Sequence, residues 1–200
     1  YCEFRDSDKA FYIYKDCKRN WMNQSNEERG SSGINIKWPD ENNSYFKDAL
    51  KKAEDGDNPN NISPIITYTL QDGIKVYWFG DLEMDFMNNI KDNVDWTKAD
   101  IVFASHHGRS SGRIPNEILE KICPKIVIIG EAPSENLDYY TGYDTITQNT
   151  AKDILIECGD STADFYVSNQ NYKTVPSCLK FIVGKNIDGY TYIGSLEYNE

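Results

Sequence analysis

Apolar and polar residues alternate most regularly in the middle of the chain. Residues 65–70 alternate with a period of two, as a half-buried strand does, and residues 74–79 repeat the pattern after the polar stretch 71–73. Two such runs joined by a short segment that ends in glycine predict a β-hairpin. The apolar run 101–104 predicts the next strand, and residues 125–129 predict another.

Helical spacing of apolar residues separates these strands. Leu82, Phe86, Met87 and Ile90 recur three and four residues apart, which predicts a helix directly after the hairpin. Other segments with this spacing are 45–53, with Ser44 as a candidate cap, 115–122, with proline at its start, and 150–158. Strands that alternate with helices predict an α/β fold.

The start of the chain is less regular than the middle. Residues 23–33 are polar and glycine-containing, which predicts an exposed loop. Residues 34–38 alternate and stop at Pro39, as a short strand does. We therefore expect residues 1–60 to form an irregular N-terminal segment and residues 61–200 to form the main domain.

The last third of the chain mixes long loops with short strands. Residues 130–147 are rich in Asn, Asp, Tyr and Gly and predict a loop long enough to be functional. Residues 165–167 predict a short strand, and the alternating segments 179–183 and 190–196 predict a closing antiparallel hairpin.

The composition narrows the classes of function. A chain of 200 residues is long enough for one domain with a full core. Its net charge of −11 argues against a broad basic surface, so that any nucleic-acid site would be local. No apolar run approaches the roughly 18 residues of a membrane-spanning helix. The five cysteines lie far apart in sequence, so we expect a reduced, cytoplasmic protein.

Both histidines of the chain stand together at the end of a predicted strand. His106 and His107 follow the run 101–104, and Asp81 comes just after the second strand of the hairpin. In layered α/β folds ligands gather at strand ends, and both carboxylate and imidazole bind divalent metals. The pattern therefore predicts a metal-dependent hydrolase with these three side chains as its catalytic and metal-binding residues.

Four short motifs follow one another in a definite order. They are Asn61-Ile62-Ser63, Gly80-Asp81-Leu82-Glu83, Ala99-Asp100 and Ser105-His106-His107-Gly108. This order resembles the C-terminal half of metallo-β-lactamase-fold hydrolases, most of all domains similar to the soluble part of the DNA-uptake competence channel protein. The resemblance covers about residues 61–129 and implies an αββα sandwich, of which this chain would form the latter half.

The same resemblance implies a site for two metal ions. In that family the aspartate of the Gly-Asp motif bridges two ions, usually zinc or manganese, so Asp81 is the expected bridging ligand. His106 or His107 is then a ligand or a proton donor. Two such ions activate a water molecule near neutral pH. Adjacent strand residues point to opposite faces, so the sequence leaves open which histidine binds metal.

The chain departs from the family in one important respect. The N-terminal half of such enzymes supplies a His-x-His-x-Asp-His cluster, whereas no histidine precedes His106 here. One aspartate and two histidines are too few for two zinc sites. Either the chain is the latter half of a longer protein, which its start at Tyr1 without methionine favours, or the site is degenerate. Asp144 is one further candidate ligand, in the loop after the following strand.

The segment after the histidines indicates the substrate. Arg109, Ser110, Ser111 and Arg113 offer two guanidinium groups and two hydroxyls, which suit phosphate oxygens. If they bind substrate, a phosphodiester in nucleic acid or a nucleotide is favoured over a lactam or lactone. An ordinary polar loop is the alternative.

Aromatic residues near these motifs fall into two groups. Those expected to pack in the core are Trp78, Phe79, Phe86 and Phe103. Those in the later loop, better placed to stack on a base or ring, are Tyr139, Tyr140 and Tyr143.

The candidate residues also have plainer interpretations. Asp81 can cap the helix that follows it, and a histidine pair can simply be solvated. The leading hypothesis is a dinuclear metal hydrolase that acts on phosphodiester bonds. The alternative is a degenerate domain of the same fold that serves as a binding or assembly module for a protein partner. Stoichiometric metal is expected only of the first.

Overall fold

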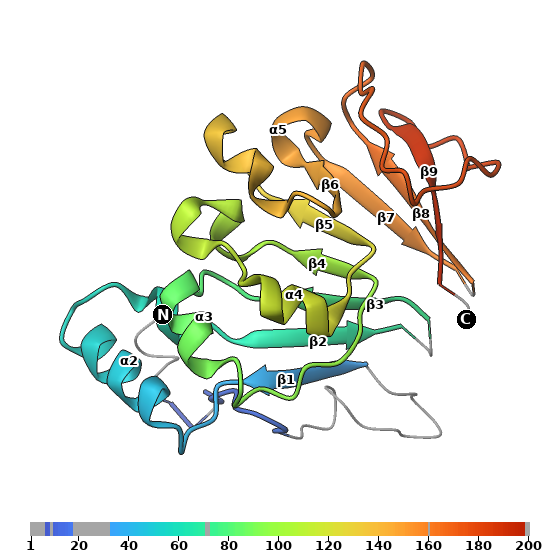
Figure 1. Cartoon of the computed structure of the whole chain (residues 1–200). Helices are drawn as coiled ribbons and strands as arrows, with labels where there is room; N and C mark the ends of the chain where they lie inside the picture. The colour runs from blue at the N-terminus through green and yellow to red at the C-terminus, as the bar shows by residue number, and fades with distance from the viewer. Residues whose placement is uncertain (1–6, 9, 18–32, 71–72, 160, 199–200) are drawn as a thin grey trace, which may run out of the picture.

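A mixed sheet of six strands forms the centre of the fold (Figure 1). In order across the sheet, the strands are β1 (Ile34–Trp38), β2 (Ile65–Thr69), β3 (Lys75–Trp78), β4 (Ile101–Phe103), β5 (Ile126–Ile129) and β6 (Asp144–Thr147). The first three pair antiparallel, and β3 to β6 pair parallel. Four parallel strands therefore end at one edge of the sheet.

The computed structural model describes residues 7–8, 10–17, 33–70, 73–159 and 161–198. Most of the loop predicted over 23–33 and two residues of the turn predicted at 71–73 lie outside these ranges. The hairpin on either side of that turn is confirmed, since β2 and β3 pair antiparallel.

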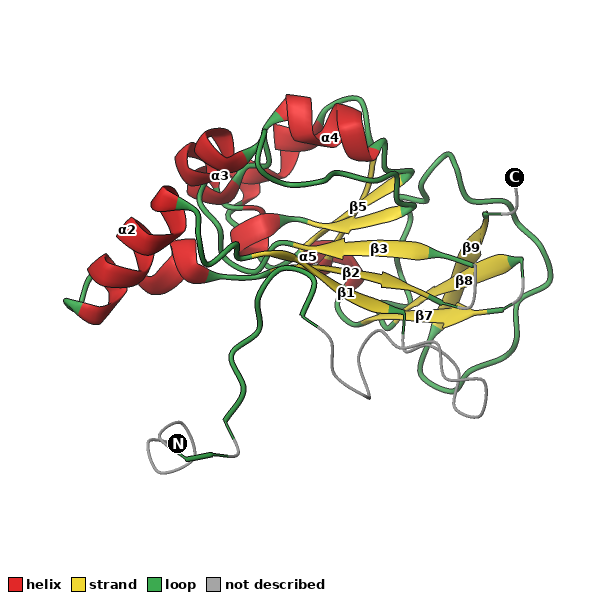
Figure 2. Ribbon diagram, turned by 90° about the horizontal axis from the view of Figure 1, so that it is seen from below, coloured by secondary structure: helices red, strands yellow, loops and turns green. Residues whose placement is uncertain are grey.

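Helices cover one face of the six-stranded sheet, as Figure 2 shows. They are α2 (Ser44–Glu54), α3 (Met84–Ile90) and α4 (Asn116–Ile122). Met87 of α3 and Leu119 of α4 pack with Val102 and Val127 of the sheet in one buried cluster. The short helix α5 (Gln148–Ala151) follows β6, and shorter 3₁₀ turns are η1 (Pro59–Ile62), η2 (Ser105–Gly108), η3 (Ser110–Gly112) and η4 (Ser134–Tyr140).

A second, antiparallel sheet covers the other face. Its strands are β7 (Ile154–Cys158), β8 (Thr162–Val167) and β9 (Thr191–Glu197). Ile101 and Ile126 alternate with the residues that face the helices, and they pack instead against Phe165 and Leu196 of the second sheet. The central strands β4 and β5 are therefore buried between two apolar layers, which explains why both are entirely apolar.

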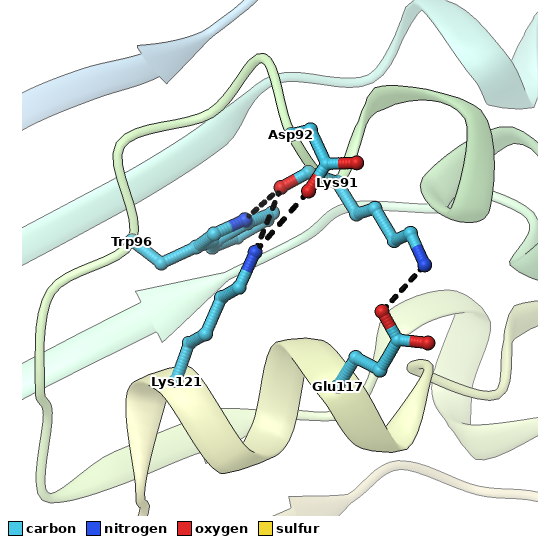
Figure 3. A network of polar contacts seen from close by, with 5 residues as sticks. All are labelled: Lys91, Asp92, Trp96, Glu117 and Lys121. Atoms are coloured by element: carbon cyan, nitrogen blue, oxygen red, sulfur yellow. Dashed lines mark hydrogen bonds and ion pairs between the residues drawn. The ribbon is translucent and has the colours of Figure 1, made fainter.

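A polar network fastens α4 to the segment after α3 (Figure 3). Lys91 forms an ion pair with Glu117, and Lys121 forms one with Asp92 at 3.5 Å. The indole nitrogen of Trp96 donates a hydrogen bond to the carbonyl oxygen of Lys91 at 2.6 Å. These ion pairs lie at the outer surface of the helical layer and link α4 to the end of α3.

The sequence predicted most of these elements, with four corrections. The segment 150–158 is not one helix: α5 ends at Ala151, and residues 154–158 form β7. Pairing with β8 outweighs the helical spacing there, since strand preference depends on cross-strand packing. The helix cap before α2 is Asn43, whose side chain accepts from the backbone N–H of Tyr45, and not Ser44.

The other two corrections concern the last third of the chain. The predicted loop 130–147 contains η4 and β6. The predicted hairpin of 179–183 with 190–196 is reduced to one bridge, between Lys180 and Ser195, because β9 pairs with β8 instead.

The expected boundary at residue 60 does not coincide with a break in packing. β1 pairs with β2 across it, and Trp38 lies in the same buried cluster as Val127. The described residues before 61 thus contribute to the same sheet and the same core. None of the described helices combines the length and apolarity needed to cross a membrane.

Candidate functional site

Hydrogen bonds fasten the end of β3 to the end of β4. The carbonyl oxygen of Gly80 accepts from the backbone N–H of His106 at 2.9 Å. The buried hydroxyl of Ser105 donates to the carbonyl oxygen of Leu82 at 2.6 Å and lies 3.2 Å from that of Gly80. The Gly-Asp and His-His-Gly motifs, far apart in sequence, are therefore held side by side at one edge of the sheet.

The backbone of the histidine pair is strained. His106 (φ 48°, ψ 47°) and His107 (φ 59°, ψ 9°) both adopt the left-handed conformation, and Gly108 follows at φ 87°. A residue other than glycine pays about 1–2 kcal/mol for this conformation. Strain of this kind collects at functional sites, where surrounding contacts maintain it. The chain thus leaves its extended path as soon as β4 ends.

Two glycines make room for the histidines. A Cβ atom on Gly112 would lie 2.4 Å from the Cβ of His106, and one on Gly130 would lie 3.1 Å from the Cβ of His107. Gly112 follows the pair in sequence, whereas Gly130 comes from the end of β5. Each neighbouring segment therefore has a glycine at the point where a larger residue would crowd a histidine.

The structure separates the roles of the two histidines. His107 and Asp81 line the same pocket, which has a volume of about 290 Å³ and lies at the carboxyl ends of the parallel strands. His106 does not line it; its Nδ1 atom is hydrogen-bonded to the hydroxyl of Ser111 at 3.1 Å. The two rings diverge, with centroids 6.4 Å apart and planes tilted by 54°. His107 is thus the histidine that shares a site with Asp81.

The carboxylate of Asp81 is not a helix cap. The N-cap of α3 is Glu83, and no side chain caps that helix. The backbone N–H of Asp81 donates to Ser63 Oγ at 3.1 Å, which fixes the turn and leaves the carboxylate without a hydrogen bond from any described residue. The ring of His107 likewise has no hydrogen-bond partner within the described ranges. Both polar groups are therefore available to a ligand.

Asparagine side chains hold the residue that follows this turn. The carboxylate of Glu83 accepts from the side-chain amides of Asn58, Asn60 and Asn61 at 3.2–3.5 Å. The Asn61 side-chain oxygen in turn accepts from the backbone N–H of Glu83 at 3.0 Å. The motif Asn61-Ile62-Ser63 therefore supports the Gly-Asp turn from both ends, a positioning role that its place in the motif order did not specify.

The predicted substrate-binding residues lie beside the histidines but outside the pocket wall. Ser111 contacts His106, and the guanidinium carbon of Arg113 lies 5.6 Å from the ring centroid of Tyr139. Arg109 and Ser110 are exposed. The loop thus presents the hydroxyl of Ser110 and the guanidinium of Arg109 to solvent on the His106 side of the site.

The structure does not bring Asp144 to this site. Asp144 begins β6 and pairs with Ile126, the first residue of β5, so it lies at the opposite edge of the sheet. Its carboxylate accepts from Ser177 Oγ at 2.9 Å and from the backbone N–H of Cys178 at 2.7 Å. Burial raises the pKa of Asp144, but these hydrogen bonds outweigh it and hold the pKa below its ordinary value. The side chain is part of the framework.

The loop tyrosines are also engaged elsewhere. The hydroxyl of Tyr140 accepts from the backbone N–H of Ile114 at 3.3 Å, and burial raises the pKa of Tyr140 to about 12. Tyr139 donates to Asn136 at 2.8 Å, and Tyr143 packs against the helical core. None of the three lines the pocket, so the predicted stacking role does not fall to them.

The described residues supply two metal donors, not a full set. Asp81 and His107 are a carboxylate and an imidazole, both of which suit zinc. No group of three or more His, Cys, Asp or Glu residues within the described ranges is arranged to hold an ion. A catalytic zinc normally has about three protein ligands, so further ligands would have to come from other groups.

Similarity to known proteins does not assign the chain to a family. No protein-family model matches it, and no curated protein matches it. Its chemistry is therefore inferred from its residues and their geometry.

Proposed function

We propose that this chain is part of a metal-dependent hydrolase that cleaves phosphodiester bonds in nucleic acid or nucleotides, with Asp81 and His107 as ligands to a divalent metal, zinc or manganese. The observation that carries the proposal is that these two residues, which follow adjacent strands, line one pocket, and that no described residue hydrogen-bonds to either polar group. Carboxylate and imidazole groups that meet at strand ends are typical metal ligands.

The layer order supports the relationship to metallo-β-lactamase-fold hydrolases. Helices, the six-stranded sheet and the second sheet lie in the order expected for one half of an αββα sandwich together with the start of the other. The Gly-Asp and His-His-Gly motifs meet at the strand ends, as the resemblance implies. Under this proposal the remaining metal ligands come from groups outside the described residues.

The chain's own residues would divide the work at this site. A divalent metal bound there would supply an activated water and stabilise charge on the phosphate. Asp81, whose turn is fixed by Ser63, would hold the metal from β3, and His107 would hold it from β4. His106, hydrogen-bonded to Ser111, lies beside the pocket and would position the loop that carries Arg109.

Phosphodiesters are the preferred substrates because of this loop. Arg109 is exposed and makes no ion pair with any described residue, so its guanidinium can bind two phosphate oxygens at once. Lactam hydrolysis has no comparable need for it. The net charge of −11 restricts this attraction to the neighbourhood of the site.

The histidine pair provides a matched test. We expect the full-length protein to hydrolyse bis(4-nitrophenyl) phosphate, to lose activity in EDTA, and to carry zinc or manganese measured by mass spectrometry. Asp81→Asn and His107→Gln should lower both metal content and activity by at least about 100-fold. Mutating a residue that only hydrogen-bonds to a metal ligand already lowers metal affinity or activity about 10–100-fold. His106→Gln, the control, should keep its metal. Equal loss from both histidine variants, or full activity in Asp81→Asn, rejects the assignment.

A second candidate is a non-catalytic binding or assembly module of the same fold. The observation that favours it is in the sequence, where no histidine precedes His106 to form the histidine cluster of the family. It predicts full-length protein without stoichiometric metal and with unchanged folding after chelation. Metal bound through Asp81 and His107 would exclude it.

A further inference from the structure

Two stacked aromatic rings line the candidate pocket. Trp78 of β3 and Phe103 of β4 are directly opposite each other in the parallel register. Their ring centroids are 5.2 Å apart and their planes differ by 11°. Both line the pocket that contains Asp81 and His107. An aromatic stack thus lines the same pocket as the candidate metal ligands.

Trp78 is unusually exposed for its position in the sheet. The strand partners follow one another across the same face, from Trp78 and Phe103 to Ile128 and Ile146. Ile128 and Ile146 are only 3% and 0% exposed, because the second sheet covers them, whereas Trp78 is 36% exposed. The expectation that Trp78 is a core residue is therefore wrong. Large aromatic side chains are costly to leave in water, and this one faces a pocket.

The rest of the pocket includes a polar side chain that can hydrogen-bond to the edge of a bound base. Ile154 and Ile156 of β7 form an apolar wall. Gln148 also lines the pocket, and its side-chain amide has no hydrogen-bond partner among the described residues. An amide offers both a donor and an acceptor, as the edge of a nucleobase requires. A volume of about 290 Å³ suits one ring system and little more.

We propose that the Trp78–Phe103 pair is the binding platform for a nucleobase of the substrate, with Gln148 at the base edge and the phosphate directed toward Asp81 and His107. This assignment rests on the proposed phosphodiester substrate and names the part of it that the pocket selects. Bases stack on aromatic side chains with little dependence on sequence, so the platform favours nucleotides as a class. An alkyl phosphodiester would leave the rings unused.

Binding of two small probes tests the platform without turnover. The full-length protein is titrated with adenosine 5′-monophosphate and with ribose 5-phosphate, by calorimetry and by tryptophan fluorescence. We expect adenosine 5′-monophosphate to bind at least about tenfold more tightly and to quench fluorescence, because stacking accounts for that difference. Trp78→Leu should remove the preference, and Trp78→Phe should retain most of it.

The control variant is Trp38→Phe. Trp38 packs against Phe46 and Phe86 in the helical-side core, none of the three lines the pocket, and its replacement should leave both affinities unchanged. Circular dichroism verifies that each variant is folded. Equal affinity for the two probes, or unchanged preference in Trp78→Leu, overturns the platform even if the protein is a hydrolase. A preference that depends on Trp78 in a protein without phosphodiesterase activity supports the platform and rejects the proposed function.

Discussion

Acidic residues at the two ends of the parallel strands differ in their contacts. We call the side of the sheet where these strands begin the amino edge and the side where they end the carboxyl edge. At the amino edge, Asp100 accepts from the backbone N–H of Lys75 at 2.9 Å and forms an ion pair with Lys125 at 3.1 Å. Asp144, at the same edge, accepts two hydrogen bonds. At the carboxyl edge, Asp81 lines a pocket and its carboxylate has no hydrogen bond from any described residue.

This difference distinguishes framework from candidate site. A carboxylate that the protein itself pairs contributes to stability, and its removal leaves partners without a bond. A carboxylate left open beside a strained histidine gives nothing to the fold and suits a ligand. Hydrogen-bond and ion-pair partners therefore distinguish framework aspartates from the candidate ligand, although all of them lie next to strands in the sequence.

The largest effect is expected from replacing one aspartate at each edge with asparagine, in two separate variants. Asp81→Asn should lower phosphodiesterase activity by at least about 100-fold and change the free energy of unfolding by less than about 0.5 kcal/mol. Asp144→Asn should instead lower the free energy of unfolding and leave the phosphodiesterase activity unchanged. Denaturant unfolding and initial rates, measured on the same preparations, give both numbers. A similar profile for the two variants breaks the contrast between the edges.

Removal of the buried hydroxyl that joins β3 to β4 comes next. Ser105→Ala deprives the carbonyl oxygen of Leu82 of its donor inside the protein, which should cost about 2 kcal/mol of unfolding free energy. It should also lower activity, because Asp81 and His107 lose their alignment. Ser134→Ala, at an exposed serine, is the control and should stay within about 0.5 kcal/mol of wild type. Wild-type stability in Ser105→Ala would show that other contacts hold the strand ends together.

A smaller, pH-dependent effect is expected at the amino edge. The pKa of Asp144 is lowered from 3.8 in the folded state, so its contribution is present above that value and is lost as the pH falls through the folded pKa. Asp144→Asn should therefore cost about 1 kcal/mol at pH 7, a modest amount because the group is partly solvated. The difference from wild type should narrow as the pH falls below the ordinary value of 3.8 and should close only once the pH is below the folded pKa. A gap that stays constant over this range would mean that the carboxylate's charge does not stabilise the fold.

The smallest effect isolates the backbone strain at the carboxyl edge. Both His107→Gly and His107→Ala remove the imidazole, but only glycine adopts the left-handed conformation freely. The glycine variant should be more stable than the alanine variant by about 0.5–1 kcal/mol. At Glu120, inside α4, the same comparison should have the opposite sign, with alanine more stable. Equal stabilities at position 107 would remove strain as a mark of this site.

Local periodicity accounts for most of what the sequence predicted correctly. β2 and β3 show the alternation of half-buried strands, β4 and β5 show the apolar runs of buried ones, and α3 and α4 show the spacing of helices that cover a sheet. The prediction was wrong at β7, where helical spacing and strand pairing compete within one short segment. Only contact with β8 decides between them, and a single sequence carries no record of that contact.

The site was predictable in outline and not in its assignment. Asp81 and the histidines follow successive strands, so a parallel sheet brings them to one edge wherever they occur in the sequence. Asp144 was misjudged because its loop contains the start of β6, and a residue that begins a parallel strand lies at the amino edge. The direction of that strand, not the type of residue, removes it from the site.

The sequence by itself determined that Asp81 and the histidines each directly follow a strand, because apolar runs mark where strands end. The tertiary structure made those strands parallel neighbours, which brings the side chains together. Only the tertiary structure decided that His107 shares a pocket with Asp81 and that His106 turns to Ser111. The physical reason is the left-handed backbone at both histidines, which no alternation pattern specifies and which depends on space left by Gly112 and Gly130. The exposure of Trp78 is likewise tertiary, since it depends on how far the second sheet extends.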